Sequence, residues 1–212
     1  MKSKPWIGWH FLLDDGYTCW NRTKVRVGSV MREPRPLAIC KVGLHASKQQ
    51  LDALQYAPGA IACLVELRGK RLDATDKSCA TERKCLAKVD ATKILHEFAC
   101  WCAWRVLLQE RCDGRKPDKR LWVAIRAKRQ WLRGNCTDQK LAAARAAGAA
   151  GAATWDAARD AARAATWDAA RAAARAAAWD ARAATWDAAW DVENNQLKSM
   201  LLRAMGKTRR DL

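Results

Sequence analysis

The clearest candidates for chemistry are cations on one side of a helix that the sequence predicts at 118–133. Four cations and one tryptophan follow one another at steps of 3, 4, 3 and 4 residues and so share one helix face: Lys119, Trp122, Arg126, Arg129 and Arg133. Ammonium and guanidinium groups bind phosphates, and an aromatic ring among them can stack on a base. We therefore expect this face to bind nucleic acid or an acidic protein surface. The alternative is an ordinary solvated helix face.

A second set of candidates is aromatic. Residues 141–191 are mostly alanine without proline, and they carry five tryptophans, each followed by aspartate: Trp155, Trp167, Trp179, Trp186 and Trp190. Alanine favours helix, so we predict helix here. A step of 12 residues turns about 120° around a straight helix, which favours a break near Thr154, Thr166 or Thr185. We expect the indoles to pack against a protein partner, another copy or the remaining chain.

An enzyme is the alternative function. His10 in a predicted first strand, the turn GLHAS at 43–47, a short helix and a strong strand resemble the split arrangement of ADP-ribosyltransferase-like folds. That resemblance implies a site for a nicotinamide dinucleotide, in which Ser47 and Glu82 would serve as the hydroxyl and the late glutamate. The chain has no phosphate loop, no HExxH and no Gly-x-Ser-x-Gly. We therefore assign no catalytic residue and expect no cofactor and no metal ion.

The net charge of +17 is unevenly distributed along the 212 residues. In 141–191 six arginines balance six aspartates, and 192–212 carries five basic residues against two acidic ones, so the remaining +14 lies on residues 1–140. A basic segment of this kind favours nucleic acid, an acidic protein or another anionic surface as the partner. The plain alternative is that the charge serves solubility.

The nine cysteines are odd in number and irregularly spaced, and no Cys-x-x-Cys pair occurs. The sequence shows neither a signal peptide nor an apolar run of membrane-spanning length. We therefore predict reduced thiols in a cytoplasmic protein, or in the host cell cytoplasm if a phage encodes it, and no membrane partner.

Local signals predict the elements that position these residues. Asp90 and Asp118 precede helical patterns as N-caps, Ser47 has Gln50 three residues on, and Gly134 is a typical helix end. Strands are predicted at 6–13, 17–20, 24–27, 60–69 and 83–89, and helices at 91–110, 118–133 and 195–205. The stretch 37–47 is predicted as a strand that runs into a turn at residues 43–45. The fold class is α+β. Its predicted parts are a mixed domain over 1–112, a basic helical connector over 113–136, the alanine-rich repeat over 137–192, and a capping helix with a loose basic tail over 193–212.

Several stretches resemble a family of uncharacterised phage and bacterial proteins. They include WHFLLDDG (9–16), CKVGLHAS (40–47), DATKILHEFACWCA (90–103) and the Trp-Asp tract. The tract is also similar to alanine-rich repeats in proposed immunity proteins of toxin systems. The resemblance implies a phage or mobile-element origin and, by analogy, an accessory protein that binds host or defence proteins. It gives no residue a role.

These observations together favour a non-enzymatic accessory protein. We expect its repeat to mediate self-association or protein partner binding, and its basic part to bind nucleic acid or an acidic protein. A nucleotide-using enzyme and a purely structural, self-assembling protein remain the alternatives.

Overall fold

The computed structural model describes residues 5–150 and 173–208, without the side chains of 173–188. These residues form an α+β fold, as the sequence predicts. The chain divides into two compact units. Unit 1 comprises Met1–Leu95 with Val192–Leu212, and unit 2 comprises His96–Asp191.

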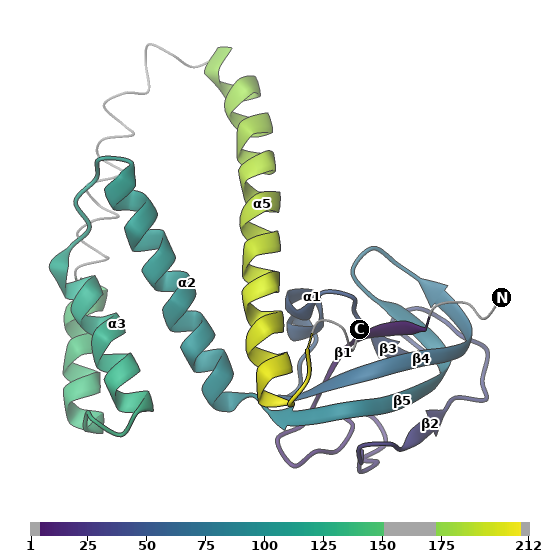
Figure 1. Ribbon diagram of the computed structural model, residues 1–212. Coiled ribbons are helices and arrows are strands. Elements are labelled where there is room, and N and C mark those ends of the chain that lie inside the picture. Colours follow the sequence, from purple (N-terminus) through teal and green to yellow (C-terminus); the bar gives the residue numbers. More distant parts are fainter. Residues whose placement is uncertain (1–4, 151–172, 209–212) are drawn as a thin grey trace. The chain divides into compact units, whose positions relative to one another are not determined.

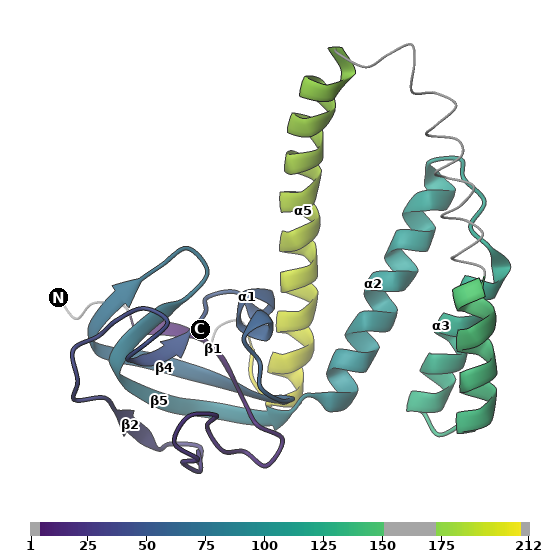
Figure 2. The ribbon, with the colours of Figure 1, turned by 180° about the vertical axis from the view of Figure 1, so that it is seen from behind.

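An antiparallel sheet organises unit 1, and Figures 1 and 2 show it from opposite sides. Its strands are β1 (Trp6–Leu12), β2 (Val30–Arg32), β3 (Leu44–Ala46), β4 (Ile61–Asp73) and β5 (Ser78–Asp90). Their order is β1-β4-β5-β2, and β3 also pairs with β5. Strands β4 and β5 form a long hairpin closed by a turn in which the Ala74 N–H donates to the Lys77 carbonyl at 2.8 Å. The first half of β4, 61–67, is mostly apolar and largely buried on both faces, whereas its second half, 68–73, is exposed.

The two faces of this sheet both bury apolar side chains. One face contributes Leu12, Cys63, Val65 and Cys85 to a common cluster. Alternation along β1 and β4 sends Trp9, Phe11 and Leu64 to the opposite face, where they are also fully buried. Because both faces are buried, a residue's position in the strand does not by itself tell whether it is exposed.

Helix α1 (Gln50–Gln55) and the end of α5 (Ala173–Ala204) belong to the same unit, and Figure 1 shows them side by side. The Asn194 side-chain oxygen accepts a hydrogen bond from the Leu51 N–H at 3.0 Å. With its amide oriented to satisfy both neighbours, Gln50 accepts from Trp9 Nε1 at 2.5 Å and donates to the Asn194 carbonyl at 3.2 Å. Leu197, Leu201 and Leu202 of α5 are fully buried. Each such side chain stabilises the fold by about 1.5–3 kcal/mol.

Unit 2 contains most of α2 (Thr92–Cys112), α3 (Lys119–Leu132) and a helix over 138–150. The caps predicted for α2 and α3 are present. The Asp90 carboxylate accepts from the Thr92 N–H at 2.8 Å, the Asp118 carboxylate accepts from the Arg120 N–H at 2.8 Å, and Gly134 has a φ of +77° beyond the end of α3. A Cβ on Gly148 would lie 3.0 Å from the Ala124 side chain, so helix 138–150 approaches α3 closely.

The strands predicted at 17–20 and 24–27 are wrong. Only a single bridge between Tyr17 and Lys24 forms there, and the strand that joins the sheet is β2, where the sequence predicts no strand. Alternation in a short loop imitates a strand, whereas pairing with β5 decides which residues join the sheet. The helix cap predicted at Ser47 is also wrong. Ser47 exchanges backbone hydrogen bonds with Trp9 at 2.7 and 2.9 Å, and α1 begins three residues later without a side-chain cap.

The alanine-rich region differs from its prediction at its end. Helix α5 continues through Thr185, so no break occurs there, and the capping helix predicted at 195–205 is the end of α5. Thr154 and Thr166, the other predicted break points, lie outside the described residues. The compact units meet after residues 95 and 191. The parts predicted from the sequence end at residues 112, 136 and 192. The buried leucines of α5 account for the placement of 192–212 in unit 1.

Candidate functional site

A groove between α2 and α3 contains part of the predicted cationic face. Its volume is about 410 Å³, and α3 lines it with Lys119, Trp122, Val123 and Arg126. Helix α2 contributes Trp104, Leu108 and Arg111. The groove therefore combines two indole rings, two aliphatic side chains and three cations, all from unit 2.

The two indoles meet edge to face. Trp104 and Trp122 have ring centroids 4.6 Å apart and planes at 85°. Cations lie over both rings: the Arg129 guanidinium is 4.8 Å from the Trp104 ring centre, and the Arg111 guanidinium is 6.0 Å from that of Trp122. Edge-to-face packing and cation–π contacts each add about 0.5–1.5 kcal/mol beyond burial, so the rings are held in defined orientations.

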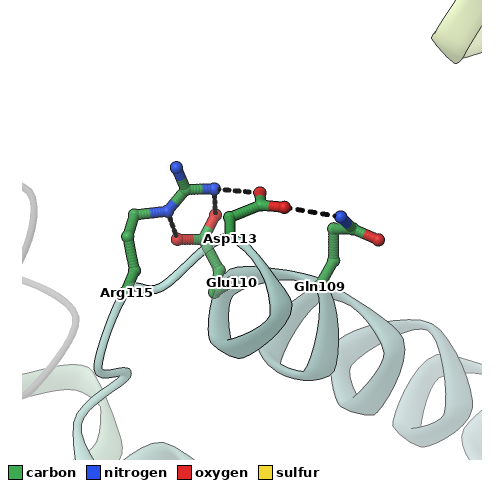
Figure 3. Close-up of polar contacts among 4 residues, drawn as sticks. All are labelled: Gln109, Glu110, Asp113 and Arg115. Carbon is green, nitrogen blue, oxygen red and sulfur yellow. Dashed lines mark hydrogen bonds and ion pairs between the residues drawn. The ribbon is translucent and has the colours of Figure 1, made fainter.

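Ion pairs and hydrogen bonds stabilise the start of the connection from α2 to α3 (Figure 3). Arg115 binds the Glu110 carboxylate through two nitrogens and donates to Asp113 at 2.5 Å. Gln109 in turn donates to Asp113 at 2.7 Å. Gly114, with a φ of +78°, lets the chain turn between these side chains. These contacts hold the start of the connection against the end of α2.

The groove cations keep their charge available. The nearby acids are bound elsewhere, since Arg115 holds Glu110 and Asp113, and Arg120 holds Asp118 at 2.5 Å. Among the residues that the structure describes, no ion pair involves Arg111, Lys119 or Arg126. Three positive charges beside two indoles can bind an anion that also offers a flat ring.

Two predicted members of the cationic face do not line the groove. Arg129 is half-buried, stacks on Trp104 and donates to the Cys100 carbonyl at 3.5 Å, so its guanidinium serves helix packing. Arg133 is the exposed C-cap residue of α3. Sequence reasoning missed Trp104, Leu108 and Arg111. Their spacing of four and three residues places them on one helix face, which is the signal that could have found them.

Of the five repeat tryptophans, the structure describes the side chain of Trp190. Trp155 and Trp167 lie outside the described residues, and for Trp179 and Trp186 the helix is described but the side chains are not. Trp190 is 37 % exposed on α5. Packing of the first four indoles therefore stays a prediction.

The structure brings together only some of the residues that an ADP-ribosyltransferase-like site would need. His10 faces the same cluster as Leu12, and burial, then the charges of Arg83 and His45, hold its pKa well below the ordinary value of 6.5. Arg83, 5 % exposed, donates to the His45 carbonyl at 2.7 Å, and burial lowers the pKa of its guanidinium to about 10. His45 accepts from the Cys40 N–H at 3.2 Å.

The glutamate that this alternative needs is elsewhere. Glu82 precedes Arg83 in β5, so its side chain leaves the opposite face of the strand, where it pairs with Arg32 at 3.2 Å. Ser47 is buried and held by its backbone bonds to Trp9. His10 and His45 are therefore accompanied by the buried Arg83, and Glu82 lies on the other face of β5.

Three or more His, Cys, Asp or Glu side chains are nowhere grouped so that they could hold a metal ion, within the described ranges. No described helix has both the length and the apolar character needed to cross a membrane.

Comparisons with known proteins concern unit 1. A family model with the description "Domain of unknown function (DUF7666)" matches residues 12–97. This stretch reaches from the end of β1 into α2 and covers less than half of the chain, and it ends before the first groove residue, Trp104. No curated protein and no solved structure matches the chain. Over 12–97 the chain is thus similar to a family that carries no functional assignment.

Proposed function

We propose that this protein is a phage-type accessory protein that acts by binding, and that the groove between α2 and α3 holds single-stranded nucleic acid. The observation that carries the proposal is the pair of orthogonal indoles, Trp104 and Trp122, surrounded by Arg111, Lys119 and Arg126. Aromatic platforms with flanking cations are the common means of binding single strands, because every base has a face to stack and every nucleotide a phosphate to pair.

The aromatic content of the groove favours nucleic acid over an acidic protein. Carboxylates on a protein surface satisfy cations but offer no flat ring for Trp104 and Trp122. A single strand offers both, and base–indole stacking is worth about 1–3 kcal/mol per base. A duplex offers phosphates while its bases stay stacked on one another, so it uses only the cations.

The alanine-rich repeat has a separate role in this proposal, namely self-association or binding of a protein partner. Support comes from its tryptophan and aspartate content and from Trp190, which is part-exposed on α5. The molar mass in solution tests this part. A stable oligomer supports self-association, whereas a monomer at every concentration leaves only the heterologous partner.

Fluorescence anisotropy with a labelled oligothymidylate tests the groove. The full chain should bind the single strand more tightly than a duplex of the same length. Trp122→Leu keeps an apolar side chain but removes the ring, and it should weaken binding about fivefold or more. Arg133→Gln, which removes a cation of the same helix outside the groove, is the matched control.

Two results would overturn the proposal. If the oligothymidylate does not bind at moderate salt, the groove has no nucleic-acid role. If polyglutamate displaces the strand at equal charge concentration and Trp122→Leu changes nothing, the cations serve an acidic protein.

A further inference from the structure

The most exposed large apolar side chain among the described residues lies far along the sequence from the groove. Trp20 is 92 % exposed, compared with 59 % for Val27 and 58 % for Val106. Single exposed apolar residues are ordinary on protein surfaces. Trp20 differs because its whole indole is in water, and because the loop that carries it is firmly held.

Hydrogen bonds fix the loop on both sides of Trp20. The Thr18 N–H donates to the Thr23 carbonyl at 3.0 Å, and the Thr23 N–H donates back to the Thr18 hydroxyl at 2.9 Å. The Thr18 hydroxyl also donates to the Asn21 side-chain oxygen at 2.5 Å. Arg22 adopts a φ of +49°, in the left-handed region, which turns the chain back directly after the tip. A tip ordered in advance loses little conformational entropy when it binds.

Cationic side chains follow Trp20 within six residues of the sequence. Lys24 and Arg26 are exposed, and no ion pair between described residues involves either of them. The nearest acids in the sequence are already bound: Asp15 pairs with Arg22 at 2.7 Å, and Asp14 accepts from the Ala60 N–H at 2.7 Å. The loop thus presents one open indole and unneutralised positive charge.

We propose that Trp20 is a second base-stacking contact for single-stranded nucleic acid, located on unit 1, with Lys24 and Arg26 binding the adjoining phosphates. Its ligand class is that of the proposed function, on which it rests, but its residues are independent of the groove. Charge complementarity selects an anionic partner, and the open ring selects one with flat faces. The contact lies within the stretch that matches the family model, whereas the groove lies outside it.

The test measures binding of labelled oligothymidylate to the full chain and three variants. Trp20→Ala should weaken binding by roughly fivefold to hundredfold, the range of one base–indole stack. Trp20→Phe keeps a flat ring and should recover most of that loss. Val27→Ala, a change of an exposed apolar residue in the same segment, should leave binding unchanged. A strand containing 5-iododeoxyuridine should cross-link to Trp20 under ultraviolet light, as mapped by mass spectrometry.

The outcomes separate this contact from the groove. Stacking at Trp20 is refuted if Trp20→Ala binds the strand within twofold of the affinity of the unmodified chain. It is also refuted if Trp20→Ala and Trp20→Phe lose the same affinity. If Trp122→Leu weakens binding in the same assay, the proposed groove then stands alone. The converse result is that Trp20→Ala loses affinity and Trp20 cross-links to the strand while Trp122→Leu has no effect. That result supports the contact at Trp20 and refutes the role of the groove. If neither the unmodified chain nor any variant binds the strand, both proposals are refuted.

Discussion

Replacing Lys119 and Arg126 by glutamine removes two of the three cations that line the groove between α2 and α3. Both side chains are exposed and take part in no ion pair among the described residues, so we expect the variant to fold like the unmodified chain. The substitution leaves Trp104 and Trp122 in place. It therefore isolates the electrostatic part of binding from stacking.

The magnitude follows from counterion release. Each phosphate contact on a single strand contributes about −0.7 to the slope of log K against log salt, so losing two contacts makes the slope shallower by about 1.4. This difference does not depend on how many contacts other parts of the chain supply. Between 50 and 200 mM salt, the advantage of the unmodified chain over the variant should shrink about sevenfold.

Anisotropy titrations with the same oligothymidylate at four salt concentrations measure both slopes. Arg133→Gln changes the net charge by one outside the groove, and its slope should equal that of the unmodified chain. Equal slopes for the double variant and the unmodified chain would show that Lys119 and Arg126 contact no phosphate. A shallower slope for Arg133→Gln as well would show that overall charge, and not the groove, governs binding.

Three further predictions concern stability and are measured by urea unfolding followed by circular dichroism. Asn194→Ala leaves the buried Leu51 N–H without its 3.0 Å acceptor and should cost about 1–3 kcal/mol, whereas exposed Asn195→Ala should cost less; equal effects would contradict the role of Asn194 as the tie between α1 and α5. Asp118→Ala removes the N-cap of α3 and should cost about 0.5–2 kcal/mol in unit 2; no loss would mean that the cap is dispensable. His10 has a pKa well below 6.5 in the folded protein, so the unfolded chain takes up the proton first as the pH falls. Stability should therefore decline below about pH 6.5 by up to about 1.4 kcal/mol per pH unit for this group, and the decline should be shallower in His10→Gln. An unchanged decline would contradict the lowered pKa of His10.

Local chemistry made much of the helical unit predictable. Asp118 accepts from the N–H two residues on, and Gly134 takes a positive φ after the last turn of α3; both features involve neighbours in sequence. The shared face of Lys119, Trp122 and Arg126 follows from helix periodicity alone, and the structure places all three in one groove. The strong apolar stretch at 60–69 that became β4 and the strand at 83–89 that became part of β5 were also predicted, although both strands extend beyond the predicted limits.

The sequence by itself determined the α+β class, the caps of α2 and α3 and the shared face of Lys119, Trp122 and Arg126, because the caps and the face depend on residues a few positions apart. Tertiary structure alone decided which helix completes the groove: Trp104 of α2 packs edge to face against Trp122 of α3. It likewise paired Ser47 with Trp9 and tied Asn194 to Leu51, 143 positions apart. Such contacts depend on which buried surfaces fit together, and no local pattern of residue types carries that information.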